Sequence, residues 1–127
     1  MIYGIGIDII DIKRIRKVAE KYGDKFKKKC FNESEIIRSE KKYNSVESYA
    51  KRYAAKEACA KALGTGLARG VHWKDIEVRN NEYGKPFILL HKKAKNLMKN
   101  YTKDKYKIEV SLTDEKEFAI ANVIIFK

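Results

Sequence analysis

The hydrophobic positions of the first half change period along the chain. Small and β-branched residues alternate over residues 2–7, which predicts a buried strand. Apolar residues then recur at the three- and four-residue spacing of an amphipathic helix over residues 12–22, and a lysine-rich turn follows. Three helices are expected, over residues 12–22, 33–42 and 45–63, with caps at Asp8 or Asp11, at Asn32, and at Asn44 or Ser45, and with Gly23 and Gly64 as stops.

Strand patterns dominate the second half. Strands are expected over residues 76–79, 87–90, 108–113 and 118–126, and a helix over residues 92–101. Residues 80–86 and 114–117 have the polar composition of turns. Because helices crowd the first half and strands the second, we expect an α+β fold with a helix-rich first half packed on a mostly antiparallel sheet. A length of 127 residues predicts one domain, residues 1–127.

The composition is that of a globular protein, with 44% hydrophobic and 36% charged residues. No apolar run approaches the roughly 20 residues that span a bilayer, so no membrane association is expected. We expect residues 1–7 to be a strand rather than a signal peptide, and the protein to be cytoplasmic, although a trimmed organelle precursor stays open. Cys30 and Cys59 lack the spacing of a disulfide framework or a zinc site.

The net charge of +12 is concentrated in two basic runs, residues 13–29 and 92–107. Such a field attracts polyanions, which include nucleic acid, acidic lipid, nucleotide phosphates and strongly acidic proteins. The alternative for both runs is a lysine-rich surface that only keeps the protein soluble.

The segment from Arg52 to Gly66 combines one carboxylate, several cations and a glycine pair. Residues four apart share a helix face, so Glu57 and Lys61 form one row and Arg52 and Lys56 an adjacent one. By spacing alone, a surface ion pair between Glu57 and Lys61 explains this pattern. The many alanines of the segment instead indicate a helix that other backbone approaches closely. Such a face can hold a metal ion and phosphate oxygens together.

Asp8 is a second candidate metal ligand, although an acid between a strand and a helix is also a common cap. Two carboxylates from different elements, with positions left for water and phosphate oxygens, suit Mg²⁺. The glycines match neither a Walker A loop nor a dinucleotide fingerprint. The residues therefore predict Mg²⁺-dependent phosphoryl or phosphodiester chemistry at Asp8 and Glu57.

Two motifs resemble those of the holo-acyl-carrier-protein synthases, the small type of 4′-phosphopantetheinyl transferase. Residues 6–15 (GIDIIDIKRI) are similar to the family's Gly-x-Asp signature, which precedes a helix with Arg. Residues 52–66 (RYAAKEACAKALGTG) resemble its Lys-Glu-Ala-x-x-Lys segment. The turn Gly84-Lys85-Pro86 and the late segment from Val110 to Thr113 also agree, so the resemblance covers nearly the whole chain.

The resemblance implies a 4′-phosphopantetheinyl transferase-like fold and transfer of the 4′-phosphopantetheine group from coenzyme A to a serine of apo acyl carrier protein, in fatty acid biosynthesis. Asp8 and Glu57 are the implied Mg²⁺ ligands, and Lys61 is an implied phosphate contact and possible general acid. The general base is either Glu57 or a water on the metal. The implied coenzyme contacts are Arg52, Lys56, Lys61, Gly64, Lys85, Pro86 and Ser111. A carrier-docking surface is implied at Lys13, Arg14, Lys17 and Lys21, and a homotrimer with active sites between subunits is also implied.

One position departs from the family pattern, because Asp114 follows Thr113 where the family commonly has His near the coenzyme. An acid there repels phosphate unless it faces away, so we expect weaker or rearranged nucleotide contacts on that side. Two other classes stay open. A basic nucleic-acid-binding module is suggested by the pI of about 9.6, although no motif of that class occurs. A structural trimer without activity is suggested only by Asp114.

Overall fold

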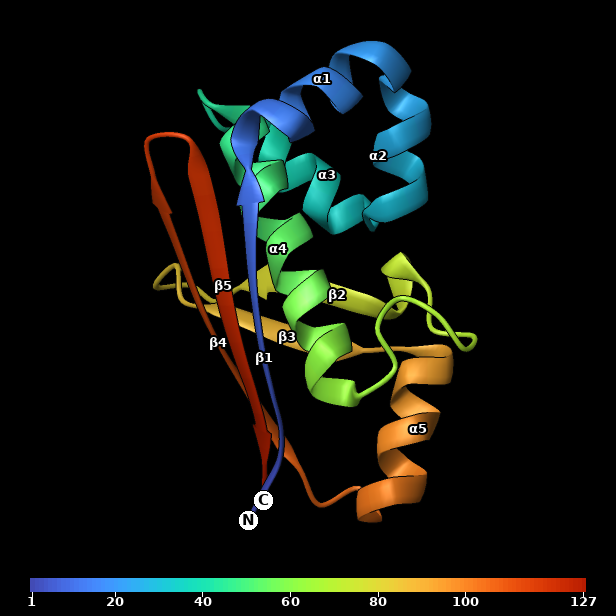
Figure 1. Ribbon diagram of the computed structural model, residues 1–127. Coiled ribbons are helices and arrows are strands. Elements are labelled where there is room, and N and C mark those ends of the chain that lie inside the picture. Colours follow the sequence, from blue (N-terminus) through green and yellow to red (C-terminus); the bar gives the residue numbers. More distant parts are fainter.

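The computed structural model describes all 127 residues, and its helices and strands are arranged as Figure 1 shows. The strands are β1 (Ile2–Asp11), β2 (Ile76–Asn80), β3 (Pro86–Leu90), β4 (Lys107–Glu115) and β5 (Phe118–Phe126). The helices are α1 (Ile12–Tyr22), α2 (Asp24–Cys30), α3 (Glu33–Glu40), α4 (Ser45–Leu63) and α5 (Lys92–Thr102), with a 3₁₀ turn over Trp73–Asp75. No helix has the length and apolar character needed to cross a membrane.

The strands form a three-stranded sheet in the order β1–β5–β4 and a separate β2–β3 hairpin, and every pair is antiparallel. The long helix α4 packs on β1 and β5 and also contacts β2 (Figure 1). Because β1 pairs with β5, the helix-rich and strand-rich halves share one sheet, and the chain ends lie side by side. The expected α+β class with antiparallel sheet is confirmed.

Strand β1 lies directly on the backbone of α4. A side chain at Gly4 would overlap the carbonyl group of Ala62, and one at Gly6 would overlap that of Ala58. The expectation that other backbone approaches the alanine-rich helix closely is therefore confirmed. Since alternate residues of a strand share a face, Asp8 follows Gly4 and Gly6 on the side that faces α4.

Two local predictions were wrong. The strand continues to Asp11 because its last residues pair with β5, where Asp8 is opposite Ala121. Of the two expected caps of α1, Asp11 is confirmed, since its side chain accepts a hydrogen bond from the Lys13 amide at 2.9 Å, and Asp8 caps nothing. The expected lysine-rich turn is instead the helix α2, which buries two apolar side chains four positions apart, Phe26 and Cys30.

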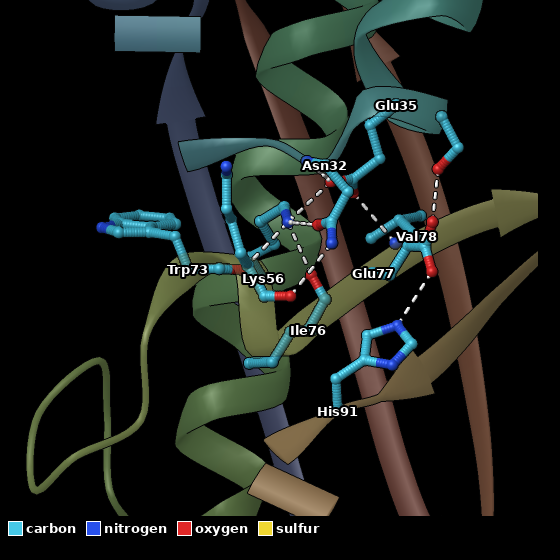
Figure 2. A network of polar contacts seen from close by, with 10 residues as sticks. Asn32, Glu35, Lys56, Trp73, Ile76, Glu77, Val78 and His91 are labelled. Carbon is cyan, nitrogen blue, oxygen red and sulfur yellow. Dashed lines mark hydrogen bonds and ion pairs between the residues drawn. The ribbon is translucent and has the colours of Figure 1, made fainter. Parts of the chain in front are cut away.

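A buried ion pair joins α4 to α3 and β2 (Figure 2). Lys56 is completely buried, and its Nζ lies 2.8 Å from Oε1 of Glu35 and donates to the carbonyl oxygen of Ile76 at 2.5 Å. Burial lowers the pKa of Lys56, and the Glu35 carboxylate opposes that shift. Glu35 also accepts hydrogen bonds from the amides of Asn32 at 2.7 Å and Val78 at 2.9 Å. The pair thus fixes three elements around one point.

Replacing Lys56 with methionine is expected to destabilise the fold strongly, because Glu35 would be left buried without its cation. Removing one member of a buried pair costs about 3–5 kcal/mol in the free energy of unfolding. The double variant Lys56→Met, Glu35→Gln should lose less than the single one, since a neutral amide oxygen still accepts from the Val78 amide. Urea unfolding followed by circular dichroism measures both.

The matched control is Lys13→Met, which removes an exposed ion pair with Glu117 at 3.1 Å and should cost at most about 1 kcal/mol. A Lys56→Met variant as stable as this control would show that the buried pair does not hold the three elements together.

Candidate functional site

Asp8 of β1 and Lys61 of α4 meet at the edge of the three-stranded sheet. The Nζ of Lys61 lies 3.1 Å from Oδ1 of Asp8 and donates to the carbonyl oxygen of Ile7 at 3.0 Å. The side chain of Lys61 is 52% exposed and that of Asp8 is 17% exposed, so the pair lies at the surface with its cation facing solvent. Lys61 makes this pair rather than the surface pair with Glu57 that helical spacing alone suggested.

Glu57 is half-buried beside the same pair. Burial raises the pKa of its carboxyl group and the negative charge of Asp8 raises it further, whereas Lys61 and Arg14 lower it. Burial also raises the pKa of Tyr53, with Glu57 as the next cause. The structure therefore brings together Asp8, Glu57 and Lys61, with Arg14 of α1 close by.

We call this cluster the carboxylate site. It could bind a metal ion only if water or a ligand supplied the remaining coordinating atoms. No group of three or more His, Cys, Asp or Glu side chains in the structure is arranged to hold a metal ion. Asp8 and Glu57 repel one another, and a cation between them would relieve that repulsion. Two hard oxygen donors with the remaining positions left to water or phosphate match the chemistry of Mg²⁺.

A second group of predicted residues lies on another side of α4, in a cavity of about 520 Å³. We call it the arginine cavity. It lies between the end of α3, the start of α4, the β2–β3 hairpin and β4. Two predicted coenzyme contacts, Arg52 and Pro86, line it, as do three further basic residues, Arg38, Lys42 and Lys51. Glu47 is the one acidic residue in its wall.

Arg52 is held rigidly at the base of this cavity. Its side chain is buried, with Nη1 donating to Oγ of Ser48 at 3.0 Å and Nη2 to Oδ1 of Asn80 at 2.7 Å. The Nε atom is buried without a hydrogen-bond partner. A buried N–H without an acceptor is costly, so Arg52 keeps one unsatisfied donor beside the cavity.

Two predicted coenzyme contacts do not fit their predicted role. Lys56 is completely buried and directs its ammonium group into the Glu35 network, so its assignment as a coenzyme contact was wrong. Ser111 is opposite Asn122 on the exposed face of the sheet, whereas its neighbour Leu112 faces the arginine cavity. Ser111 is therefore not part of that cavity.

Gly64 and Lys85 lie apart from the arginine cavity. Gly64 ends α4 in the left-handed conformation, with φ of 85°, and lines a different cavity with Tyr3 and Tyr101. Lys85 precedes Pro86 but forms an exposed ion pair with Glu109 at 3.2 Å. The predicted coenzyme contacts thus fall into separate places on one chain.

The predicted docking residues lie on the exposed surface of α1. Arg14, Lys17 and Lys21 are three and four positions apart and share one face of the helix. Lys13, four positions before Lys17, lies at the margin of this face and pairs with Glu117. Since Arg14 lowers the pKa of Glu57, the basic face begins at the carboxylate site and runs away from it.

Apart from Arg52 and Pro86, the lining of the arginine cavity was not predicted from the sequence, and the missed residues include the cations Arg38, Lys42 and Lys51 and the amide of Asn80. Nothing in the sequence separates these cations from the many lysines around them. The turn composition of residues 80–86 predicted a hairpin at Asn80 but not its hydrogen bond to Arg52.

Comparison with known proteins defines the class. The model of the 4′-phosphopantetheinyl transferase superfamily matches residues 4–123, and the chain belongs to this family. A holo-acyl-carrier-protein synthase of Rhizobium leguminosarum bv. trifolii is 47% identical over 98% of this chain and 95% of its own. The predicted resemblance to these synthases is thus confirmed.

Solved structures agree with this membership. The holo-acyl-carrier-protein synthase of Neisseria meningitidis superposes with a TM-score of 0.88 at 33% identity, covering 100% of both chains. The synthase of Helicobacter pylori in complex with coenzyme A superposes with a TM-score of 0.83 at 32% identity, covering 96% of this chain and 99% of that one.

Glu57→Gln is expected to stabilise the metal-free protein near neutral pH. The pKa of Glu57 is raised in the folded state, so its charged form costs stability above that pKa and its neutral form does not below it. The gain in melting temperature over the wild type should therefore shrink as the pH is lowered through the acidic range. Thermal unfolding at several pH values measures this difference.

The exposed Glu20→Gln serves as the control and should show no such gain. Added Mg²⁺ should raise the melting temperature of the wild type but not that of Glu57→Gln. A Glu57→Gln variant that is less stable at neutral pH, or that still responds to Mg²⁺, would contradict this description of the site.

Proposed function

We propose that this chain transfers the 4′-phosphopantetheine group from coenzyme A to a serine hydroxyl of apo acyl carrier protein and thereby serves fatty acid biosynthesis. The observation that carries the proposal is the carboxylate site, in which Asp8, Glu57 and Lys61 converge in a member of this family. The basic face of α1 beside it supports an acidic protein as the second substrate. The two buried, unpaired cysteines favour a reducing, cytoplasmic location.

Asp8 and Glu57 are the residues that would hold Mg²⁺, together with oxygens of the substrate pyrophosphate. When bound, the ion would neutralise phosphate charge and polarise the reacting phosphoryl group. Lys61 extends from the same site into solvent, where its ammonium group can neutralise a further phosphate oxygen. Transfer forms a bond from the serine oxygen to the phosphorus that carries pantetheine and breaks the bond from that phosphorus to adenosine 3′,5′-bisphosphate. In this proposal Lys61 gives a proton to that leaving group.

Arg14, Lys17 and Lys21 are the proposed docking residues, with Lys13 at their margin. Their common face begins beside Glu57, so a carrier bound there would present its serine near the carboxylate site. Opposite charges on two proteins raise the encounter rate and orient the partners, and salt weakens both effects.

We further propose that one chain carries two incomplete halves of the site. Glu57 and Arg52 are five positions apart on α4, so their side chains leave the helix about 140° apart. Asp8 lies on β1 at one edge of the three-stranded sheet, and the arginine cavity lies against β4 at the other edge. A substrate that uses both halves therefore needs a second copy of the chain.

A homotrimer meets this need. If the β1 edge of one copy lies beside the β4 edge of the next, both halves come together, and the repeated head-to-tail contact closes into a ring. The outer face of β1 supports such an assembly, because Ile5, Ile7 and Ile9 are each 60–61% exposed there. A row of exposed branched apolar side chains on a sheet is typical of a covered interface.

The transfer reaction is tested by incubating the protein with Mg²⁺, coenzyme A and an apo acyl carrier protein and then measuring the mass of the carrier. The wild type is expected to add one phosphopantetheine group to each carrier. Glu57→Gln should reduce the rate at least 100-fold, because it removes one of the two proposed ligands, whereas Glu20→Gln should not change it. A carrier of unchanged mass with the wild type, or full activity of Glu57→Gln, would contradict the proposal.

The divided site predicts complementation between chains. Glu57→Gln and Arg52→Met should each be inactive alone, but mixed trimers should regain activity at sites that join the two intact halves. With random mixing that fraction is about one quarter of all sites. Mixing Glu57→Gln with Asp8→Asn, which damage the same half, should regain nothing. Monomeric wild-type protein by light scattering, or no recovery in mixed trimers of the first pair, would refute the divided site.

A further inference from the structure

An ion pair at the rim of the arginine cavity is left unused by the proposed function. Lys51 of α4 lines the cavity, and its Nζ lies 3.3 Å from Oδ1 of Asp114 near the end of β4. Both side chains are about one-third exposed. Asp114 itself does not line the cavity, so it contacts Lys51 from outside the lining.

The strand register explains the position of Asp114. Asp114 is opposite Ala119 and lies two residues after Leu112, on the face of β4 that is turned toward α4. Lys51 lies next to Arg52 and three positions after Ser48, on the side of α4 that lines the cavity. The two side chains therefore meet at the rim, where the end of the sheet approaches the start of the helix.

The charge balance in the cavity indicates what the ion pair does. Four basic side chains surround the space against one acid, Glu47, and the Nε of Arg52 has no partner. A lysine ammonium has three donor hydrogens, so Lys51 can keep its contact with Asp114 and still donate to an oxyanion in the cavity. Because an exposed ion pair of this kind adds little to stability, its main physical effect is to restrict a long, flexible side chain.

We infer that Lys51, positioned by Asp114, is a specificity-determining cation that recognises the phosphate monoester of a nucleotide in the arginine cavity. The inference rests on the proposed function, in which coenzyme A supplies that group as its 3′-phosphate. Asp114, expected above to repel phosphate, acts instead by holding Lys51 toward it. The contact between Asp114 and Lys51 would thus explain why the nucleotide contacts on this side are rearranged, as the sequence led us to expect.

The test compares two ligands that differ only in this group, coenzyme A and 3′-dephospho-coenzyme A, by isothermal titration calorimetry on the assembled wild-type protein and variants. Lys51→Met should weaken coenzyme A binding about 10-fold, the equivalent of one lost charge-assisted contact, and change dephospho-coenzyme A less than 2-fold. Asp114→Asn should weaken coenzyme A about 3-fold, with no effect on the dephospho ligand. Asp114→Glu, which keeps the carboxylate, should bind coenzyme A more tightly than Asp114→Asn.

The double variant Lys51→Met, Asp114→Asn should bind as Lys51→Met alone, because Asp114 acts only through Lys51. Glu117→Gln, in the same β4–β5 hairpin but paired with Lys13, is the matched control and should bind both ligands normally. Tighter coenzyme A binding by Asp114→Asn, or an equal loss for both ligands in Lys51→Met, would overturn the inference. Wild-type protein that binds both ligands equally would overturn it alone, whereas wild-type protein that binds neither would contradict the proposed function as well.

Discussion

The close approach of β1 to α4 is the constraint on which the rest of the structure depends. Gly4 and Gly6 have no side chains, so the strand lies directly on the helix backbone at Ala62 and Ala58. A strand held further away would separate Asp8 from Lys61, whose atoms are 3.1 Å apart. The carboxylate site therefore depends on small residues of two elements, which allow the two backbones to come into contact. This contact brings the charged side chains of β1 and α4 within reach of one another.

The helix α4 divides its functions around its circumference. Glu57 and Lys61 lie toward β1 and α1, where the site is open to solvent. Lys56 lies in the interior and ties the helix to Glu35, while Arg52 lies below the arginine cavity. The rigid helix thus fixes the spacing between a site that faces one edge of the sheet and a cavity that faces the other. Burying Lys56 costs desolvation, which its full set of hydrogen bonds offsets (Figure 2).

Much of the fold and part of the site could be predicted from the sequence, because local patterns carried that information. The capping residues gave α4 with its end at Gly64, and the motif residues Asp8, Glu57 and Lys61 do converge. Tertiary contacts decided what was missed. Lys61 pairs with Asp8, 53 positions away, and Lys56 is buried. No local sequence pattern distinguishes these two lysines from the lysines that lie on the surface.

The same reasoning explains why net charge alone suggested too broad a set of partners. A formal charge of +12 treats all lysines and arginines alike, but the fold places them in different surroundings. Lys56 forms a buried ion pair with Glu35 in the core, and Lys51 forms an ion pair with Asp114 beside the arginine cavity. Arg14 lies near the Glu57 carboxylate on the exposed surface of α1. Nonspecific attraction to polyanions depends on the sum of these charges, whereas recognition depends on which of them are fixed and face an open space. The fixed cations lie at the carboxylate site and around the arginine cavity, and this arrangement suits a compact phosphate ligand better than an extended nucleic acid.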